Sequence, residues 1–318
     1  MPPPIAVALA TCNGARFLPE LLHSIAAQTV SAGPIIAGDD GSTDATLACL
    51  TAGGCRLLGS PASRRPQNQN PHDTPQPNEP PSPPPRLGPA ANFNRVLAAS
   101  DAPWTALCDQ DDLWETNRLA TLAAVADRQD ASVPTLIVHD LALIDAAGAP
   151  IAPSYWSWQA YDPQRGSNLR TLLVMNSFPG CAMIANRALL DRALPIPADA
   201  VMHDWWLALV AAACGQIVVV PQALVRYRQH GENVMGAKRF RWWPRAGAGP
   251  AAELQRAARQ AQALAQRLAG RVTPDAAGLM RAVAGCAGAG WCQRRLRLQA
   301  AGITKIPWSR HLGFLLRA

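Results

Sequence analysis

The chain has 318 residues, 49% of them hydrophobic, and a net charge of +7 at pH 7. It is long for one domain but suits an α/β enzyme core with additions. The eight cysteines form no CxxC pair and no Cys/His zinc spacing, which argues against a zinc site and favours a reducing, cytoplasmic compartment. No run of about 20 apolar residues is free of charge and proline, and the first residues lack the features of a signal peptide, so neither a membrane span nor secretion is expected.

The positive charge comes almost entirely from arginine, because Lys238 and Lys305 are the only lysines. A basic surface suits an anionic partner, such as a nucleotide, a nucleic acid or an acidic membrane face. The arginines are spread along the chain without a recognisable nucleic-acid-reading motif, so no nucleic-acid partner is expected.

Apolar runs alternate with helical periodicity through the first half of the chain, which predicts an α/β fold with a doubly wound, mostly parallel sheet. The run at 5–10 has the continuous hydrophobicity of a buried parallel strand. The predicted strands lie at 5–10, 34–38, 56–58, 104–108, 135–139 (with 141–145 extending it) and 216–220. The predicted helices lie at 17–25, 45–50, 93–97, 113–125, 202–214, 254–268 and 279–298.

The segment 61–89 differs from its surroundings, because it contains eleven prolines and almost no apolar side chains. Such a composition cannot supply a packed core, so we expect a disordered or polyproline-like insertion. A solvated surface loop is favoured over a ligand for a proline-binding partner.

Asp109, Asp111 and Asp112 place three carboxylates within four positions, directly after the predicted strand 104–108. In an open α/β sheet, ligands bind at the carboxyl ends of the strands. Carboxylates about 4 Å apart repel by about 4 kcal/mol at an effective dielectric of about 20, and a divalent cation would offset that repulsion. Oxygen ligands suit Mg²⁺ or Mn²⁺ rather than zinc. The alternative is that Asp111 or Asp112 caps a following helix.

Two further stretches leave alternatives open. Tyr155, Trp156, Trp158 and Tyr161 form an aromatic cluster, for which core packing and a sugar-stacking acceptor wall are both considered. At the end of the chain, 308–317 combines Trp and Leu with Arg and His, and either peripheral contact with the inner membrane face or docking onto the protein body would explain it.

Seven short motifs lie at the boundaries of the predicted elements between residues 5 and 236. They are Ala10–Gly14, Asp39–Asp44, Asn92–Asn94, Asp109–Trp114, Pro179–Met183, His203–Trp206 and Tyr227–Asn233. In this order they resemble the inverting family 2 glycosyltransferases of the GT-A fold, and most closely the rhamnosyltransferase-like bacterial members. The resemblance implies a GT-A-like domain over 1–236 and leaves a helical C-terminal extension over 237–318.

The resemblance implies a binding site for a nucleoside-diphosphate sugar. Its donor-binding residues would be Thr11, Asn13, Asp39, Asp40, Asp109, Asp112 and His230. Asp109 and Asp111 match the family's DxD motif, which would hold Mn²⁺ or Mg²⁺ against the diphosphate. A satisfied structural histidine is the alternative for His230.

The resemblance also implies that Asp204 takes the proton from an acceptor hydroxyl, and that Gly180, Cys181, Trp205 and Trp206 lie in the acceptor region. Because Asp204 opens a predicted helix, a plain N-cap is the alternative role. The acceptor would be a saccharide or a lipid-linked saccharide in cell-surface polysaccharide synthesis, and the rhamnosyltransferase likeness favours dTDP-rhamnose as the donor.

Other function classes compete with this interpretation. A nucleotide-binding oxidoreductase needs a GxGxxG turn after the first strand, and residues 11–16 lack one. A basic nucleic-acid-binding protein and a catalytically inactive nucleotide-sugar-binding protein are the remaining alternatives, and the retained Asp109, Asp111 and Asp204 argue against the latter.

Overall fold

The computed structural model describes residues 4–59, 86–231 and 250–306. Within them, one nine-stranded sheet has the order β3-β2-β1-β4-β8-β6-β9-β5, and β7 pairs with β6. The strands are β1 (Ile5–Thr11), β2 (Ile35–Asp39), β3 (Arg56–Leu57), β4 (Trp104–Asp109), β5 (Leu113–Trp114), β6 (Thr135–Asp145), β7 (Pro150–Ala152), β8 (Met183–Asn186) and β9 (Gln216–Gln229).

Within the described residues, four of the eight pairs of neighbouring strands are parallel, and they include the three longest pairings of the sheet. Strand β1 lies parallel to β2 and β4, β2 lies parallel to β3, and β6 lies parallel to β9. Strand β8 is antiparallel between β4 and β6, and the short β5 and β7 are also antiparallel to their partners. The predicted α/β fold with a mostly parallel sheet is therefore confirmed.

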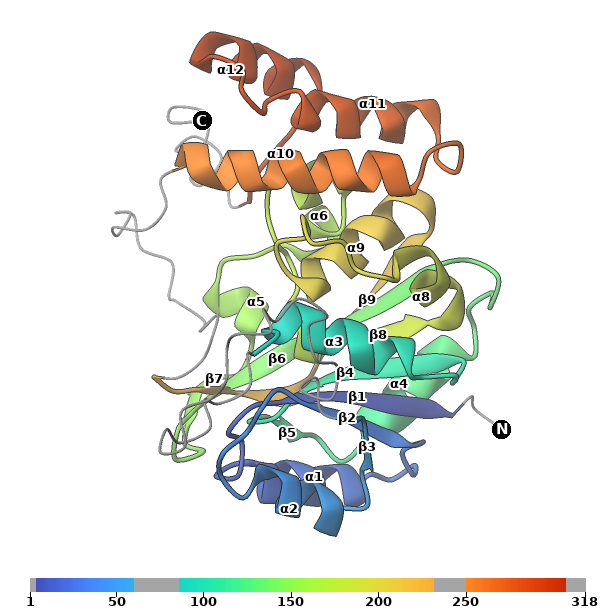
Figure 1. Cartoon of the computed structure of the whole chain (residues 1–318), viewed down its shortest axis with the longest axis vertical. Helices are drawn as coiled ribbons and strands as arrows, with labels where there is room; N and C mark the ends of the chain where they lie inside the picture. The colour runs from blue at the N-terminus through green and yellow to red at the C-terminus, as the bar shows by residue number, and fades with distance from the viewer. Residues whose placement is uncertain (1–3, 60–85, 232–249, 307–318) are drawn as a thin grey trace, which may run out of the picture.

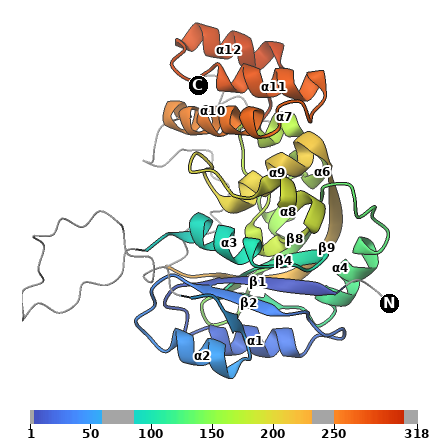
Figure 2. The ribbon, with the colours of Figure 1, turned by 45° about the vertical axis from the view of Figure 1, so that its right-hand side comes forward.

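Helices cover both faces of the sheet (Figure 1). They are α1 (Leu18–Ala26), α2 (Thr46–Ala52), α3 (Pro89–Ala98), α4 (Arg118–Ala126), α5 (Tyr155–Trp158), α6 (Pro163–Gly166), α7 (Leu169–Leu172), α8 (Arg187–Ala193), α9 (His203–Cys214), α10 (Pro250–Arg267), α11 (Pro274–Ala284) and α12 (Trp291–Ala300). Figure 2 shows α1 and α2 on one side of the sheet and α3, α8 and α9 on the other, with α10–α12 stacked beyond α9.

Two hydrophobic cores follow from the alternation of side chains along each strand. In β1, Val7 and Leu9 pack with α1 and α4 on one face, whereas Ala8 points to the other core. That second core runs from α3 through α9 and includes Leu254 and Leu264 of α10. The C-terminal helices therefore share a core with the α/β layer. The domain boundary at 236/237 stays a prediction.

The structure corrects several predicted boundaries. Leu113 lies in β5, and the helix expected from it begins only at Arg118. The predicted helix 279–298 is wrong, because α11 and α12 are separate helices. Glycines at 285, 288 and 290 interrupt them, and Gly288 has a φ of 72°, which favours glycine.

Other differences concern lengths. Strand β6 runs without a break through Asp140, and β9 extends to Gln229. Helix α3 begins at Pro89, where the insertion was expected to end. The predictions for most of that insertion (60–85) and for the chain end (307–318) lie outside the described residues. No helix formed by the described residues combines the length and hydropathy needed to cross a membrane.

Candidate active site

The register of the parallel strands brings three polar loops to one edge of the sheet. Thr11 pairs with Asp39, and Ala10 pairs with Asp109. The loops that follow β1, β2 and β4 therefore begin side by side. The hydroxyl of Thr11 donates to Asp39 Oδ1 (3.0 Å), and the backbone N–H of Ser42 donates to Asp39 Oδ2 (2.9 Å). These bonds fix the Asp39 carboxylate at the carboxyl edge, where open α/β sheets bind ligands.

Two reciprocal hydrogen bonds join the loop after β1 to the loop after β4. We call the latter, which carries Asp109, Asp111 and Asp112, the acidic loop. The N–H of Cys12 donates to Gln110 Oε1 (2.8 Å), and Gln110 Nε2 donates to the Cys12 carbonyl (3.0 Å). A Cβ at Gly14 would lie 2.4 Å from Gln110 Oε1, so a larger residue there would displace the Gln110 amide from these bonds. Asn13 adopts a left-handed φ of 51°, and its Oδ1 accepts from the N–H of Thr43 (2.9 Å). Sequence reasoning missed the role of Gln110.

Asp40 has a different environment from Asp39. Its two carboxylate oxygens accept hydrogen bonds from the backbone N–H groups of Leu87 (2.7 Å) and Gly88 (2.8 Å). Asp40 is buried and holds the point where the chain returns to the sheet before α3. These contacts give Asp40 a structural role that its predicted donor-binding role did not include.

Asp109, Asp112 and Cys181 converge at the same edge. One ligand atom from each of the three lies within 4.8 Å of the others, which makes this a group that could hold a metal ion. Burial, together with the charges of Asp111 and Asp204, raises the pKa of Asp109 to about 7. Burial and the neighbouring carboxylates raise the pKa of Asp112 well above its usual range. The shifts show that burial and mutual repulsion of the carboxylates outweigh the nearby positive charge, and a bound cation would relieve that repulsion.

The donor set favours a hard cation. Asp112 Oδ2 is buried and has no hydrogen-bond partner among the described residues. Burial raises the pKa of the Cys181 thiol well above its usual range, so a neutral thiol stands beside the carboxylates. Hard divalent cations take carboxylate oxygens rather than thiols. The acidic cluster thus suggests a divalent metal held by oxygen.

Strand β9 closes over the acidic loop through Arg228 and His230. His230 Nε2 lies 2.7 Å from Asp111 Oδ2. The backbone N–H of Arg228 donates to Asp112 Oδ1 (3.0 Å), and its Nε donates to the carbonyl of Asp111 (2.9 Å). The Arg228 side chain is only 2% exposed and also reaches Glu20 of α1 (2.7 Å). It thereby fixes the acidic loop between α1 and β9.

A second buried arginine lies beneath the acids. Arg118 of α4 has no exposed surface, and burial lowers its pKa to about 10. Its Nη2 donates to the Cys181 carbonyl (2.8 Å), and its Nε donates to Nε2 of His139 (3.3 Å). Burial and this cation lower the pKa of His139 to about 3, so the histidine stays neutral. Arg118 supplies positive charge below Asp112 and holds the backbone at Cys181.

Asp204 lies at the N-terminal end of α9. The helix is capped at Met202, so Asp204 is not the N-cap that the alternative interpretation required. Its Oδ1 accepts from Asn176 Nδ2 (3.0 Å) and from the N–H of Trp205 (2.6 Å). Burial raises the pKa of Asp204 to about 6, although these bonds oppose the shift. A carboxylate with such a pKa can accept a proton near neutral pH.

His203 is buried beside Asp204 and stacks on Phe93 of α3, with ring centroids 3.9 Å apart. Neither ring nitrogen has a hydrogen-bond partner among the described residues, and burial lowers the pKa of His203 to about 3. A Cβ at Gly180 would lie 2.8 Å from His203 Nε2. Gly180 therefore allows the segment before β8 to approach the start of α9.

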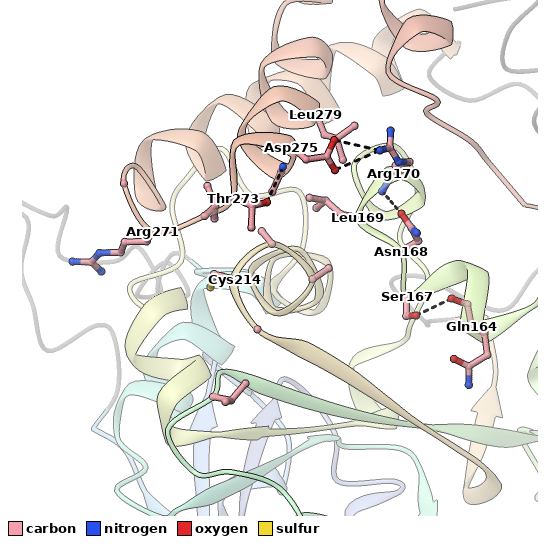
Figure 3. Close-up of a pocket in the computed structure, with 17 residues that line it drawn as sticks. Gln164, Ser167, Asn168, Leu169, Arg170, Cys214, Arg271, Thr273, Asp275 and Leu279 are labelled. Carbon is pink, nitrogen blue, oxygen red and sulfur yellow. Dashed lines mark hydrogen bonds and ion pairs between the residues drawn. The ribbon is translucent and has the colours of Figure 1, made fainter.

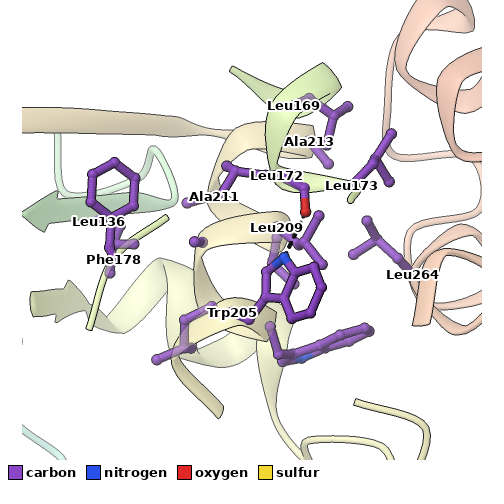
Figure 4. Close-up of a cluster of buried hydrophobic side chains, with 14 of the residues drawn as sticks. Leu136, Leu169, Leu172, Leu173, Phe178, Trp205, Leu209, Ala211, Ala213 and Leu264 are labelled. Atoms are coloured by element: carbon purple, nitrogen blue, oxygen red, sulfur yellow. Dashed lines mark hydrogen bonds between the residues drawn. The ribbon is translucent and has the colours of Figure 1, made fainter. Parts of the chain in front are cut away.

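Trp205 and Trp206 are core residues. The indole N–H of Trp205 donates to the Leu172 carbonyl (2.6 Å), and that of Trp206 donates to the Ala193 carbonyl (2.9 Å). Figure 4 shows Trp205 among Leu172, Leu209 and neighbouring apolar side chains. Trp206 has no exposed surface, and the predicted acceptor region around it stays a prediction.

The four residues of the aromatic cluster differ in burial. Trp156 and Tyr161 are buried in the core, as one of the two interpretations expected. Tyr155 and Trp158 are half-buried.

A cavity of about 1170 Å³ lies away from these acids, between α7, the C-terminal end of α9 and the α10–α11 connection (Figure 3). Arg170 and Asp275 face each other across its rim, 3.4 Å apart. Its residues include none of the predicted catalytic, donor-binding or metal-binding residues.

The chain is similar to glycosyltransferases in sequence and in fold. The family model described as "Glycosyl transferase family 2" matches residues 83–192. An uncharacterized protein of Mycobacterium tuberculosis is 28% identical over 257 residues, which cover 76% of this chain and 64% of that protein. The chain thus spans less than two thirds of that relative. An uncharacterized glycosyltransferase of Nostoc sp. is 26% identical over 238 residues, covering 72% of this chain and 66% of that protein.

Among solved structures, S. aureus TarS (residues 1–349) in complex with UDP-GlcNAc has a TM-score of 0.54 and 15% sequence identity. The match covers 98% of this chain and 89% of that chain. At this identity the likeness shows the fold, which is that of the GT-A glycosyltransferases. The family match covers 110 of the 318 residues of the chain and includes β4 and β8 of the sheet.

Proposed function

We propose that the protein is a metal-dependent, inverting family 2 glycosyltransferase that moves a sugar from a nucleoside diphosphate to an acceptor hydroxyl. The observation that carries this proposal is the placement of Gly180 and Cys181 between the two acidic groups. A Cβ at Gly180 would lie 3.6 Å from Cβ of Asp204, which belongs to α9. The next residue, Cys181, shares one cluster with Asp109, which ends β4, and with Asp112. This placement supports one acid acting on the acceptor and the other on the leaving group.

The chemistry is a single in-line displacement. The acceptor oxygen forms a bond to the anomeric carbon as the bond from that carbon to the diphosphate oxygen breaks. Asp204 takes the hydroxyl proton, a duty for which its pKa of about 6 is suitable near neutral pH. Asn176 and the N–H of Trp205 hold the carboxylate in one orientation. A single displacement of this kind inverts the anomeric carbon.

Asp109 and Asp111 would hold the cation, in agreement with the DxD motif. Asp109 ends β4 and belongs to the group of side chains that could hold a metal ion, which supports this role. Asp112 is fully buried and accepts from Arg228, so it supports the loop rather than contacting the donor. When bound, Mn²⁺ or Mg²⁺ would neutralise charge on the leaving diphosphate as a Lewis acid.

Thr11, Asn13 and Asp39 are proposed to bind the nucleoside, because they form the polar edge beside β1 and β2. His230 is proposed to orient Asp111, given their 2.7 Å contact. The finer assignments of dTDP-rhamnose as donor, of a saccharide or lipid-linked acceptor, and of a role in polysaccharide synthesis rest on the motif resemblance alone.

A transfer assay tests the proposal. Release of nucleoside diphosphate is measured from UDP-, GDP- and dTDP-sugars with and without Mn²⁺ or Mg²⁺. We expect Asp111→Ala and Asp204→Asn to abolish release, whereas the matched control Asp101→Asn, an exposed acid outside the site, retains it. If Asp111→Ala and Asp204→Asn both kept wild-type rates, the assignment would be wrong.

A thermal-shift screen identifies the donor. A nucleotide that binds the native state at a hundredfold excess over its Kd stabilises it by about 2.7 kcal/mol. A nucleotide that stabilises the protein only with a divalent cation present identifies both the base and the metal dependence. The catalytically inactive alternative predicts this stabilisation without any nucleotide release.

A further inference from the structure

Positive charge is concentrated in the C-terminal helices. Residues 250–306 contain nine Lys and Arg against two Asp and Glu, whereas residues 1–249 contain eighteen against twenty. Both acids of the C-terminal region are already paired: Glu253 with Lys305 and Asp275 with Arg170, each at 3.4 Å. The region that contains α10–α12 and their connections therefore carries most of the net positive charge of the chain.

Helix α12 also exposes apolar side chains. Leu296 is 67% exposed and Trp291 is 49% exposed, which are the two largest exposed fractions among the large hydrophobic residues that the structure describes. Arg295 lies over the Trp291 ring at 5.4 Å. We call Trp291, Arg295 and Leu296, with the exposed Cys292, the α12 face.

The residue spacing places the α12 face on one side of the helix. At 100° per residue, Trp291, Arg295, Cys292 and Leu296 fall within about 140° of the helix circumference. Leu298 lies outside that arc and is buried. Arg297 also lies outside it and bonds the Gly285 carbonyl at the end of α11. Leu298, about 20° from Trp291 around the helix, is the buried residue of α12, whereas Trp291 and Leu296 are exposed. Figures 1 and 2 show α12 as the outermost helix at its end of the molecule.

We propose that the α12 face docks on an anionic lipid surface. Arginine attracts lipid phosphates, and each basic residue near an anionic membrane strengthens binding about fivefold. Trp and Leu gain from burial at the headgroup boundary, where Trp is enriched. A nucleic-acid phosphate backbone would use the arginines but would gain nothing from Leu296. The combination of charge and exposed apolar side chains therefore favours a bilayer, and the proposal does not depend on the glycosyltransferase assignment.

The test is flotation of the full chain with vesicles. Vesicles of phosphatidylcholine with phosphatidylglycerol should bind the protein, vesicles of phosphatidylcholine alone should not, and added salt should weaken binding. The double variant Trp291→Ser/Leu296→Gln should bind at least about tenfold more weakly, because neither side chain could then bury apolar surface in the membrane. Arg295→Gln should bind about fivefold more weakly.

The matched controls lie on the opposite side of the molecule. Leu47→Gln removes an apolar side chain of α2 that is 47% exposed, and Arg128→Gln removes an exposed arginine after α4. Both should bind vesicles as the wild type does. All variants change exposed or half-exposed side chains, and thermal melts verify that each is folded.

Three outcomes would overturn the proposal. The first is vesicle binding that the α12 variants leave unchanged. The second is equally tight binding to a short DNA duplex that depends on Arg295 but not on Leu296, which would indicate a polyanion site. The third is a change in oligomeric state of the Trp291→Ser/Leu296→Gln variant without vesicles, which would identify the α12 face as an interface between copies of this chain.

Discussion

His230 Nε2 lies 2.7 Å from Asp111 Oδ2, although the two residues are 119 positions apart. Two residues earlier, Arg228 bonds both the carbonyl of Asp111 and the carboxylate of Asp112. The end of β9 thus determines where the acidic loop after β4 places its carboxylates. Any change that loosens β9 from this loop should affect the proposed metal site, even if it leaves every acid in place.

Asp204→Asn should reduce transfer by about 10²–10⁴-fold and leave nucleotide affinity unchanged, because the substitution removes only the proposed base. In the wild type, transfer should rise as the pH passes about 6, where Asp204 loses its proton. Steady-state rates from acid to neutral pH, with calorimetry for nucleotide binding, check both expectations. A variant that lost nucleotide affinity to the same extent as rate would point to a binding role instead.

Asp204 should also make the folded state less stable at neutral pH. Its folded pKa is raised to about 6 from 3.8, so the native state binds the proton more tightly than the unfolded state does. The stability from this group is present below about pH 4 and is lost as the pH rises through about 6. Asp204→Asn should therefore raise the free energy of unfolding at pH 7 by up to about 3 kcal/mol. Urea denaturation measures it, and a less stable variant would contradict the expectation.

Arg228→Met should destabilise the fold by about 2–4 kcal/mol, because it leaves the buried carbonyl of Asp111 without its donor and removes the contact with Phe17. Transfer should fall as well, since the acidic loop loses its support. Glu20→Gln changes the other end of the ion pair, where the side chain is 62% exposed, and should cost less than about 1 kcal/mol. Equal losses for the two variants in urea denaturation would show that the ion pair, not the backbone contact, matters.

His203→Phe should stabilise the protein increasingly toward acid pH. The folded pKa of His203 is about 3, against 6.5 in the unfolded chain, so below 6.5 the unfolded state binds more protons. The wild type therefore loses stability from this group as the pH falls from about 6.5 toward 3. The gain of the variant should grow by about 1.4 kcal/mol per pH unit in that range. A pH-independent difference between variant and wild type in urea denaturation would rule this out.

Substitutions of Asp39 and Asp40 should have different effects on nucleotide affinity. Asp40→Ala leaves the N–H groups of Leu87 and Gly88 without their acceptor, and each such loss costs about 1–3 kcal/mol of stability. Nucleotide affinity should change little in that variant. Asp39→Ala should weaken nucleotide binding, because Asp39 lies at the carboxyl edge beside Thr11. Calorimetric titration distinguishes the two, and a large loss of affinity for Asp40→Ala would restore its predicted donor-binding role.

The sequence alone determined the strands that build the sheet edge. The continuous apolar run at 5–10 and the short, β-compatible stretch 104–108 predict strands, and the polar residues after them mark the carboxyl edge. The positions of Asp109, Asp111 and Asp204 at the boundaries of predicted elements were therefore enough to name them as candidate site residues. The sequence did not predict β5, because its two residues are too few to show the alternation of a strand. They form a strand only by pairing with β9.

Only the tertiary structure decided which polar residues face one another. Asp39 and Asp40 are adjacent in the sequence, yet one lies at the sheet edge and the other binds the backbone before α3. The side chains of Gln110 and Arg228 bond backbone atoms of Cys12 and Asp111. Every residue has such backbone atoms, so the sequence does not reveal these partners. Trp206 follows Asp204 by two positions, and α9 turns its indole into the core, where it donates to the Ala193 carbonyl. A sequence encodes periodicity along one element, whereas hydrogen bonds between elements depend on register and packing, which arise only when the chain has folded.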